Sequence, residues 1–222
     1  PPQDVVSAAK RESCLSISYT YTEPTVFFEF TQDVGILARE VGLKNVYVSN
    51  GFMSPQTIAL LARWLDAANV DIKAFSDEVY RKHIGARLQP VLDACSLLKQ
   101  AGVWLEITTL LIPGLNDDEA QIRGLTRYIA RELGAETPWH VSRFFPQYKY
   151  QNADATSVGS IEKAMEIGKA EGLRYVYAGN IAGSADTYCP QCGAVLIKRS
   201  GMSTLSSRVS HKGACPVCGA RI

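Results

Sequence analysis

The sequence predicts an α/β protein in which helices cover a parallel sheet that forms a barrel or a partial barrel. Short β-type runs alternate with helix-type runs from residue 16 to residue 178, with short connections and no hairpin signal. The chain has 222 residues and is 46% hydrophobic, which is enough for a sizeable core. Strict β–α repetition favours a barrel over an open sheet, but the six predicted strands are fewer than the eight of a closed (β/α) barrel.

The first strand and the helix after it show the repeating unit most clearly. Aromatic and β-branched residues alternate with serines and threonines over residues 16–22, as in a strand. Pro24 then suits the first turn of a helix, and apolar residues recur at helical spacing over residues 27–41. Glu23 therefore lies at the carboxyl end of a strand, where α/β sheets and barrels place their ligands.

The same unit recurs along the chain. Further strands are predicted at residues 45–50, 69–75, 103–112, 139–145 and 173–178. Helices are predicted at residues 1–12, 54–65, 88–101, 117–133 and 160–170, with a polar turn or short helix at 76–86. Prolines or acidic residues near several helix starts, and glycines after helix ends, support these boundaries.

Composition and motifs exclude several classes of protein. The net charge is +1, and no apolar run approaches the roughly 20 residues that cross a bilayer. The amino-terminal residues lack the order of a signal peptide, so we expect a cytoplasmic protein without a membrane partner. A few basic residues near the carboxyl end are too weak a signal for nucleic-acid binding. The sequence contains no dinucleotide, P-loop, serine-hydrolase or zinc-protease motif.

Two C-x-x-C pairs form the strongest local signal. Four of the six cysteines are Cys189, Cys192, Cys215 and Cys218, and a glycine follows each pair. Two such knuckles around a hairpin predict a zinc ribbon over residues 184–222, with a rubredoxin-like iron as the main competitor. Four thiolates leave no open coordination position, so the predicted site is structural. The preceding residues 1–183 are predicted to form the barrel.

Polar residues collect near the carboxyl ends of the predicted strands. A barrel brings these ends to one mouth, where they can line a single site. Asp71 and Lys73 point to the same side of their strand, and either an internal ion pair or a zwitterionic or nucleoside ligand would explain them. Glu23 has an equally simple structural explanation as a first-turn carboxylate of a helix. His140 is interpreted first as a core histidine.

The order of these motifs resembles a known family. The stretches concerned are YTEP at 21–24, VSNG at 48–51, DIK at 71–73, LIPGLND at 111–117 and WHVSRF at 139–144. Together with the terminal C-P-x-C-G pairs, they resemble the radical SAM enzyme of the AmmeMemoRadiSam system, a relative of the pyruvate formate-lyase activating enzymes. The motifs are specific in combination and weak singly.

The resemblance implies a partial (β/α)6 barrel that holds S-adenosylmethionine (SAM) against a [4Fe-4S] cluster and generates a 5'-deoxyadenosyl radical for hydrogen abstraction. Glu23 would meet the methionine ammonium, Asn50, Asp71 and Lys73 would surround the ligand, and Thr108 is a further candidate. The substrate stays open: a glycyl radical partner, another macromolecule and a small molecule are all compatible with the sequence.

Two departures from the family pattern shape the remaining expectations. The C-x-x-x-C-x-x-C loop of the family does not occur in this sequence, so we expect the first strand and the cluster ligands to lie upstream of Pro1 and this fragment alone to be inactive. Phe145 stands where relatives often have histidine. The alternative is a degenerate barrel that serves as a scaffold, with its ribbon binding a protein or nucleic acid. A zinc-dependent hydrolase is disfavoured because the predicted metal site is fully ligated.

Overall fold

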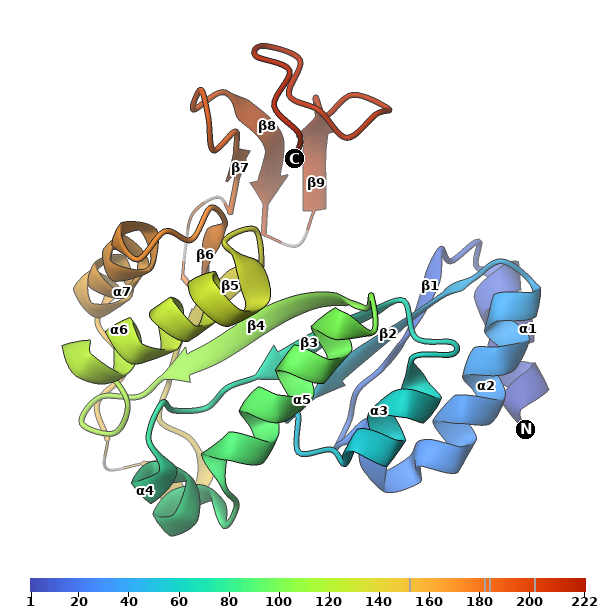
Figure 1. The fold of residues 1–222 in the computed structure, drawn as a ribbon, viewed down its shortest axis with the longest axis horizontal. Helices are drawn as coiled ribbons and strands as arrows, with labels where there is room; N and C mark the ends of the chain where they lie inside the picture. The colour runs from blue at the N-terminus through green and yellow to red at the C-terminus, as the bar shows by residue number, and fades with distance from the viewer. Residues whose placement is uncertain (152, 182, 184, 202) are drawn as a thin grey trace.

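Six parallel strands form one sheet in the order in which they occur in the chain (Figure 1). The computed structural model describes residues 1–151, 153–181, 183, 185–201 and 203–222. The strands of this sheet are β1 (Ser16–Tyr19), β2 (Lys44–Ser49), β3 (Ala67–Asp71), β4 (Trp104–Leu111), β5 (Trp139–Arg143) and β6 (Val176–Gly179). The predicted parallel α/β sheet is therefore confirmed.

Helices connect successive strands. The α-helices are α1 (Pro2–Arg11), α2 (Phe28–Glu40), α3 (Pro55–Leu61), α4 (Asp77–Val79), α5 (Leu88–Gln100), α6 (Glu119–Tyr128) and α7 (Val158–Ala170). Short 3-10 turns occupy η1 (Pro24–Phe27) and η4 (Tyr148–Tyr150), and π-helical turns η2 (Tyr80–Ile84) and η3 (Ile129–Gly134) extend α4 and α6. No helix in the part of the chain that the structure describes is long and apolar enough to span a membrane.

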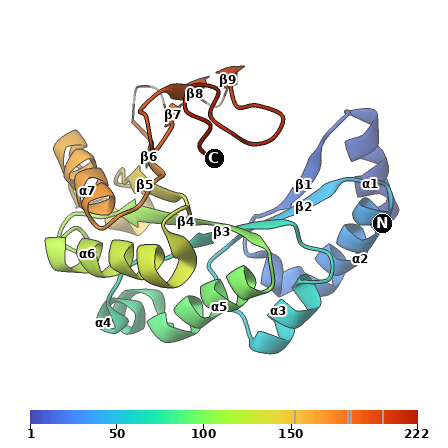
Figure 2. The same ribbon diagram turned by 45° about the horizontal axis from the view of Figure 1, so that its top comes forward.

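The helices between the strands cover one face of the sheet and leave the other face open (Figure 2). Sequential strand order with all crossovers on one side is the winding of a (β/α) barrel wall. On β4, Leu105, Ile107 and Leu111 are buried on the helix side, whereas Glu106 and Thr108 alternate with them and are half-buried on the open face. The open face of β4 therefore mixes these polar residues with the exposed Trp104 and Leu110, whereas the faces of a parallel sheet covered on both sides are apolar.

A cluster of aromatic side chains anchors the first two strands to the helices. The rings of Tyr19, Tyr47 and Trp64 meet edge to face, with centroids 5.6 to 5.8 Å apart. Asn45 lies buried beneath them, accepts a hydrogen bond from Tyr19 Oη at 2.9 Å and donates to the main-chain oxygens of Gly35 and Trp64. This cluster fixes α2 and the end of α3 against the sheet.

Gly35 allows the closest of these contacts, and its replacement tests them. A Cβ atom at this position would lie 2.2 Å from the Trp64 ring. We expect Gly35→Ala to lower the free energy of unfolding by about 1–3 kcal/mol through overpacking, as measured by urea denaturation. Gly159→Ala is the matched control, because a Cβ there meets nothing closer than 3.8 Å. An equal effect of the two substitutions would contradict this packing argument.

Several strands differ in extent from the sequence prediction, and their neighbours explain why. The strand predicted at 69–75 is β3 at Ala67–Asp71, because Ala67 pairs in register with Val46 and Trp104. It ends before Lys73, whose main-chain N donates to Tyr80 Oη at 3.1 Å and whose oxygen accepts from Asn116 Nδ2 at 2.7 Å. The main chain of Lys73 therefore hydrogen-bonds to side chains and not to a neighbouring strand.

The carboxyl-terminal residues form a separate antiparallel sheet of β7 (Thr187–Tyr188), β8 (Val195–Ser200) and β9 (Ser203–Ser207). It has its own small cluster of buried side chains, Cys189, Leu196 and Cys215. Figure 1 shows this sheet on the side of β5 and β6, and in Figure 2 it lies on the open side of the main sheet. The domain division between residues 183 and 184 stays a prediction.

Candidate functional site

Glu23 lies directly after β1 and is held in place by the end of β2. Its Oε1 accepts hydrogen bonds from Thr25 N at 3.2 Å, Thr25 Oγ1 at 3.0 Å and Ser49 Oγ at 2.8 Å. Its Oε2 accepts one from Asn50 N at 2.8 Å. A carboxylate has about four lone-pair sites, so Oε2 can still accept a donor from a ligand. Glu23 is also the cap of η1, which confirms its structural role as well.

Sequence reasoning missed Ser49. Its side chain is 3% exposed and lies on the helix side of β2, in the same register as Asn45 and Tyr47. A buried hydroxyl needs a hydrogen-bond partner, and this requirement is the signal that could have identified it. The structure supplies Glu23 Oε1 as that partner. Ser49 therefore ties the carboxylate after β1 to the end of β2.

Asn50 lies beside Glu23, but its side chain is turned into a local loop. Its Oδ1 accepts a hydrogen bond from Phe52 N at 2.8 Å, while its main-chain N binds Glu23. A contact between the Asn50 side chain and a ligand would therefore come from Nδ2.

Asp71 and Lys73 form an ion pair at the end of β3. Lys73 Nζ lies 2.9 Å from Asp71 Oδ2, and the side chains are 43% and 38% exposed respectively. An ion pair this exposed contributes about 0–1 kcal/mol to stability. A polar ligand can therefore compete for either partner at low cost.

Thr108 is the register partner of Asp71 on β4, on the open face of the sheet. Because β4 continues to Leu111, Thr108 lies within the strand and not at its end. His140 likewise lies near the start of β5, opposite Thr108. Thr109, the next residue of β4, points to the helix side, where its Oγ1 donates to Ile72 O at 3.0 Å.

The structure brings the five predicted residues to four adjacent strands, in two groups. Glu23 contacts Asn50, and Asp71 contacts Lys73 with Thr108 beside them. Adjacent strands are about 4.8 Å apart, so the groups line neighbouring positions of one sheet edge. Among the described residues, no hydrogen bond or ion pair joins the two groups. The two groups of residues offer carboxylate, amide and ammonium groups to a ligand that carries both a positive and a negative charge.

Asn116 holds the turn that supports Lys73. Besides Lys73 O, its Nδ2 donates to Leu110 O at 2.9 Å, and its Oδ1 accepts from Ile112 N at 2.6 Å. We expect Asn116→Ala to lower the free energy of unfolding by about 1–3 kcal/mol, because three half-buried main-chain groups lose the buried amide that binds them. Chemical denaturation measures this effect. Asp117→Ala, which removes one exposed bond to Gly114 N, is the control and should cost less. Equal costs would show that Asn116 does not hold this turn.

His140 has a satisfied ring nitrogen, as a structural histidine would, but it is half-buried on the open face and lies outside the core. Its Nε2 lies 2.7 Å from Glu106 Oε2, and Trp104 Nε1 donates to Glu106 Oε1 at 3.0 Å. Burial alone would raise the pKa of Glu106, but the hydrogen bonds from His140 and Trp104 and the charge of Arg199 outweigh it and lower that pKa. Glu106 is therefore ionised at neutral pH.

The four predicted metal ligands converge on one point in the ribbon. The sulfur atoms of Cys189, Cys192, Cys215 and Cys218 all lie within 4.8 Å of one another. The separations are 3.6 Å between Cys189 and Cys218 and 3.7 Å between Cys192 and Cys215. Four sulfurs at the Zn–S distance of about 2.3 Å form a tetrahedron with edges of roughly 3.8 Å, so this donor set fits a tetrahedral metal.

Glycines allow the two knuckles to turn. Gly193 and Gly219 have positive φ angles of 72° and 76°, which glycine adopts without strain. Val217 N donates to Cys215 Sγ at 3.4 Å, as expected of main-chain amides aimed at thiolates. Although burial opposes ionisation, hydrogen bonds from the main-chain N–H groups of Cys192 and Gln191 lower the pKa of Cys189 to about 6.

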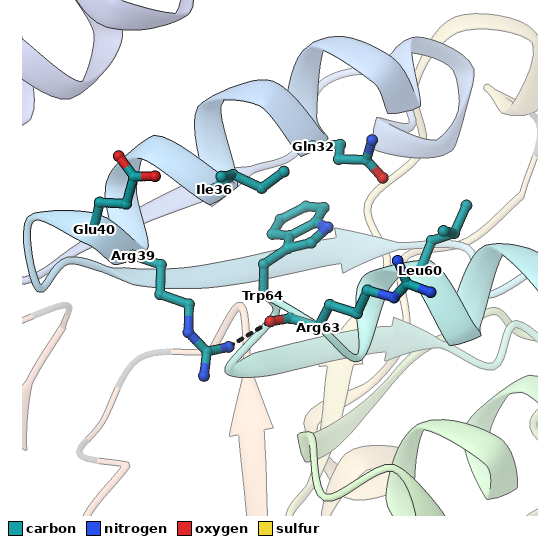
Figure 3. Close-up of a pocket in the computed structure, with 7 residues that line it drawn as sticks. All are labelled: Gln32, Ile36, Arg39, Glu40, Leu60, Arg63 and Trp64. Atoms are coloured by element: carbon teal, nitrogen blue, oxygen red, sulfur yellow. Dashed lines mark hydrogen bonds between the residues drawn. The ribbon is translucent and has the colours of Figure 1, made fainter.

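A hollow of about 420 Å³ lies on the helix side of the sheet between α2 and α3 (Figure 3). It is lined by Gln32, Ile36, Arg39, Glu40, Leu60, Arg63 and Trp64. Arg39 Nη1 donates to Arg63 O at 2.6 Å across it, and the buried Trp64 Nε1 has no hydrogen-bond partner among the residues that the structure describes. None of the predicted site residues lines this hollow.

Comparison with known proteins identifies the family. The model of the radical SAM superfamily matches residues 1–124, which is more than half of the chain. The chain belongs to the radical SAM superfamily. All of the first four strands, with Glu23, Asn50, Asp71, Lys73 and Thr108, lie within the matched part. The narrower resemblance to the AmmeMemoRadiSam system stays a prediction.

Two curated relatives place this radical SAM chain more closely. It is 41% identical over 225 residues to an uncharacterized protein of Methanocaldococcus jannaschii, covering 100% of this chain and 66% of that protein. It is 26% identical over 201 residues to the benzylsuccinate synthase activating enzyme of Thauera aromatica, covering 81% of this chain and 58% of that enzyme. The chain spans about two thirds or less of the length of these relatives.

Solved structures share the fold of this radical SAM chain. A domain of a pyruvate-formate lyase-activating enzyme from Bacteroides vulgatus matches with a TM-score of 0.63 and 18% identity, over 74% of this chain and 99% of that one. Streptococcus suis SuiB bound to S-adenosylmethionine matches with a TM-score of 0.66 and 16% identity, over 81% and 44%. The parallel sheet and its helices are thus those of radical SAM proteins.

Proposed function

We propose that the protein to which this chain belongs binds SAM at the ends of β1 to β3 and cleaves it reductively at a [4Fe-4S] cluster. The product is a 5'-deoxyadenosyl radical that abstracts hydrogen from the substrate. The observation that carries this proposal is the Glu23 carboxylate, fixed by four hydrogen bonds beside the Asp71–Lys73 pair in a chain of the radical SAM superfamily.

The charges of this site complement SAM. Glu23 and Asp71 are acidic and Lys73 is basic, so the three side chains sum to one negative charge, whereas SAM at neutral pH carries an ammonium, a sulfonium and a carboxylate. Glu23 Oε2 accepts the ammonium, and Asn50 Nδ2, Asp71, Lys73 and Thr108 supply donors and acceptors for the rest of the ligand. The barrel wall orients the molecule and keeps water from it.

The cluster does not fit the described residues of this chain. Cys14 is exposed and Cys95 is buried on α5, and the remaining four cysteines converge in the ribbon. Three thiolates outside the ribbon are therefore not available here to hold the irons. In the proposed protein the cluster ligands come from residues beyond this chain, and this chain supplies the SAM-binding strand ends.

We propose zinc as the metal of the ribbon, supported by the convergence of four sulfurs within 4.8 Å of one another, with iron as the competitor. For the substrate we favour a protein, and specifically a glycyl radical partner. The similarity to an activating enzyme supports this choice over the other classes.

The decisive experiment uses a form of the protein as long as its curated relatives. After anaerobic reconstitution with iron and sulfide and reduction with dithionite, it should convert SAM to 5'-deoxyadenosine, as measured by chromatography. This chain alone should give none. Failure of the reconstituted protein to form 5'-deoxyadenosine would overturn the proposal. If the protein is only a scaffold, the longer protein should have no affinity for SAM. Equilibrium dialysis with labelled SAM therefore distinguishes the enzyme from the scaffold.

A further inference from the structure

A chamber of about 380 Å³ lies between the open face of the sheet and the ribbon. Its floor comes from β4 to β6 and its roof from β7, β8 and the last residue of the chain. The residues that line it include Trp104, Glu106, His140, Tyr177, Ala185 and Arg199. None of the five proposed SAM contacts lines it. The volume is in the range of small-molecule sites, which is about 300–1,000 Å³.

We propose that this chamber is a second binding site, for a neutral planar heterocycle that carries two adjacent N–H donors and a neighbouring carbonyl. This edge, a 2-amino-lactam, is shared by guanine and pterins. Glu106 accepts the two donors, Arg199 donates to the carbonyl, and the ring lies against Trp104. A volume of about 380 Å³ has room for one such molecule.

Glu106 has the acceptor capacity that this ligand needs. Each carboxylate oxygen receives one hydrogen bond from the protein, Oε1 from Trp104 and Oε2 from His140. A carboxylate offers about four lone-pair sites, so one site on each oxygen is left for a pair of N–H donors. The two existing bonds also hold the carboxylate in one orientation, so little side-chain entropy is lost when a ligand binds.

Arg199 supplies the complementary donor. Its Nη1 donates to Ala185 O and to Thr187 Oγ1, both at 2.8 Å, which leaves Nε and Nη2 for a ligand. Its charge acts on Glu106, yet no ion pair joins the two side chains among the described residues. They therefore lie within electrostatic reach but beyond the roughly 4 Å of an ion pair. A carboxylate and a guanidinium held apart in this way suit a neutral ligand whose hydrogen-bond donors face Glu106 and whose acceptor faces Arg199.

The aromatic residues leave one ring for stacking. Tyr177 stacks on His140 with ring centroids 5.2 Å apart, and Arg199 lies over Tyr177 at 5.7 Å from its centroid. Trp104 has no ring partner among the described residues and is 52% exposed. The hydrogen bond from its Nε1 to Glu106 Oε1 holds the indole in one position. A planar ligand would cover this indole, an arrangement typical of heterocycle recognition.

Trp104 also provides the measurement. The chain has three tryptophans, and the other two, Trp64 and Trp139, are 2% and 0% exposed. Acrylamide quenching therefore reports mainly on Trp104. With the metal-loaded chain, we expect guanosine or 6-methylpterin to bind with one molecule per chain in equilibrium dialysis and to protect Trp104 from acrylamide. Inosine, which lacks the 2-amino group, should bind at least tenfold more weakly than guanosine.

Variants assign the binding to the chamber. Glu106→Gln should weaken binding at least tenfold, whereas Glu78→Gln, an exposed residue on α4, should leave it unchanged. Ala185→Phe fills the chamber while keeping Glu106 intact, and should abolish binding. Only variants with the circular dichroism spectrum and melting temperature of the parent are compared.

The outcomes separate the possible sources of the ligand. Binding of guanosine alone indicates a nucleoside, binding of 6-methylpterin alone indicates a pterin, and binding of both supports the shared edge. If neither molecule binds saturably, or if Glu106→Gln or Ala185→Phe binds like the parent, the proposal is overturned. The test involves no SAM and no iron, so its failure would leave the proposed radical chemistry untouched.

Discussion

Replacing Cys215 by serine is expected to abolish stoichiometric metal binding and to unfold the ribbon. Cys215 is 2% exposed and contributes one of the four converging sulfurs. Structural zinc supplies about 10–16 kcal/mol of apparent binding free energy in small zinc-finger peptides. The small cluster of buried side chains around Leu196 cannot replace a contribution of that size.

Elemental analysis by mass spectrometry should find about one zinc per parent chain and a small fraction of that in the variant. Limited proteolysis should cut the variant within residues 187–222, while the parallel sheet keeps its circular dichroism. Cys14→Ser is the matched control, because this exposed cysteine lies outside the four-sulfur cluster. Full metal content in Cys215→Ser would refute the assignment of Cys215 as a ligand. Iron instead of zinc in the parent chain would show that the ribbon holds a rubredoxin-like iron centre.

Replacing Glu23 by glutamine should weaken SAM binding by about 10- to 100-fold, the cost of removing a charge-assisted hydrogen bond. Glutamine keeps the length of the side chain and can still accept from Thr25 and Ser49. Its amide nitrogen, however, would face the Asn50 N–H, donor against donor, and it offers no negative charge to an ammonium. The affinity of the reconstituted longer protein for SAM, measured by equilibrium dialysis, tests this expectation.

Glu29→Gln is the control for this change. Glu29 is exposed on α2, six residues from Glu23, so its replacement removes the same charge from the surface without touching the strand ends. We expect unchanged SAM affinity for this variant. Should Glu23→Gln bind SAM as well as Glu29→Gln does, Glu23 would be only the cap of η1, and the proposed ammonium contact would have to be given up.

The features of this protein that depend on neighbouring residues were predicted well from the sequence. The two C-x-x-C pairs specify their own knuckles, because each pair and its following glycine lie within one turn of chain. The alternation of strand and helix, and the position of Glu23 after β1, follow from local hydrophobic periodicity and from Pro24. Asp71 and Lys73 share a side of the chain because side chains of an extended segment alternate.

Other features depend on residues that lie far apart in the sequence. The length of β3 depends on its pairing with β2 and β4, and Lys73 leaves the ladder because Tyr80 and Asn116 bind its main chain. The depth of Thr108 within β4 and of His140 within β5 is likewise a matter of strand register. Local periodicity carries no information about register between strands, so the extent of β3 was misjudged.

The sequence by itself determined the α/β class, the four thiol ligands and the acidic residue at the first strand end. Only the tertiary structure decided that Ser49 and Asn50 hold Glu23, that Glu106 pairs with His140, and that a chamber separates the sheet from the ribbon. The physical reason is that backbone propensity and hydrophobic periodicity act over a few residues. Hydrogen bonds between side chains of different strands, by contrast, form only after the whole sheet has assembled.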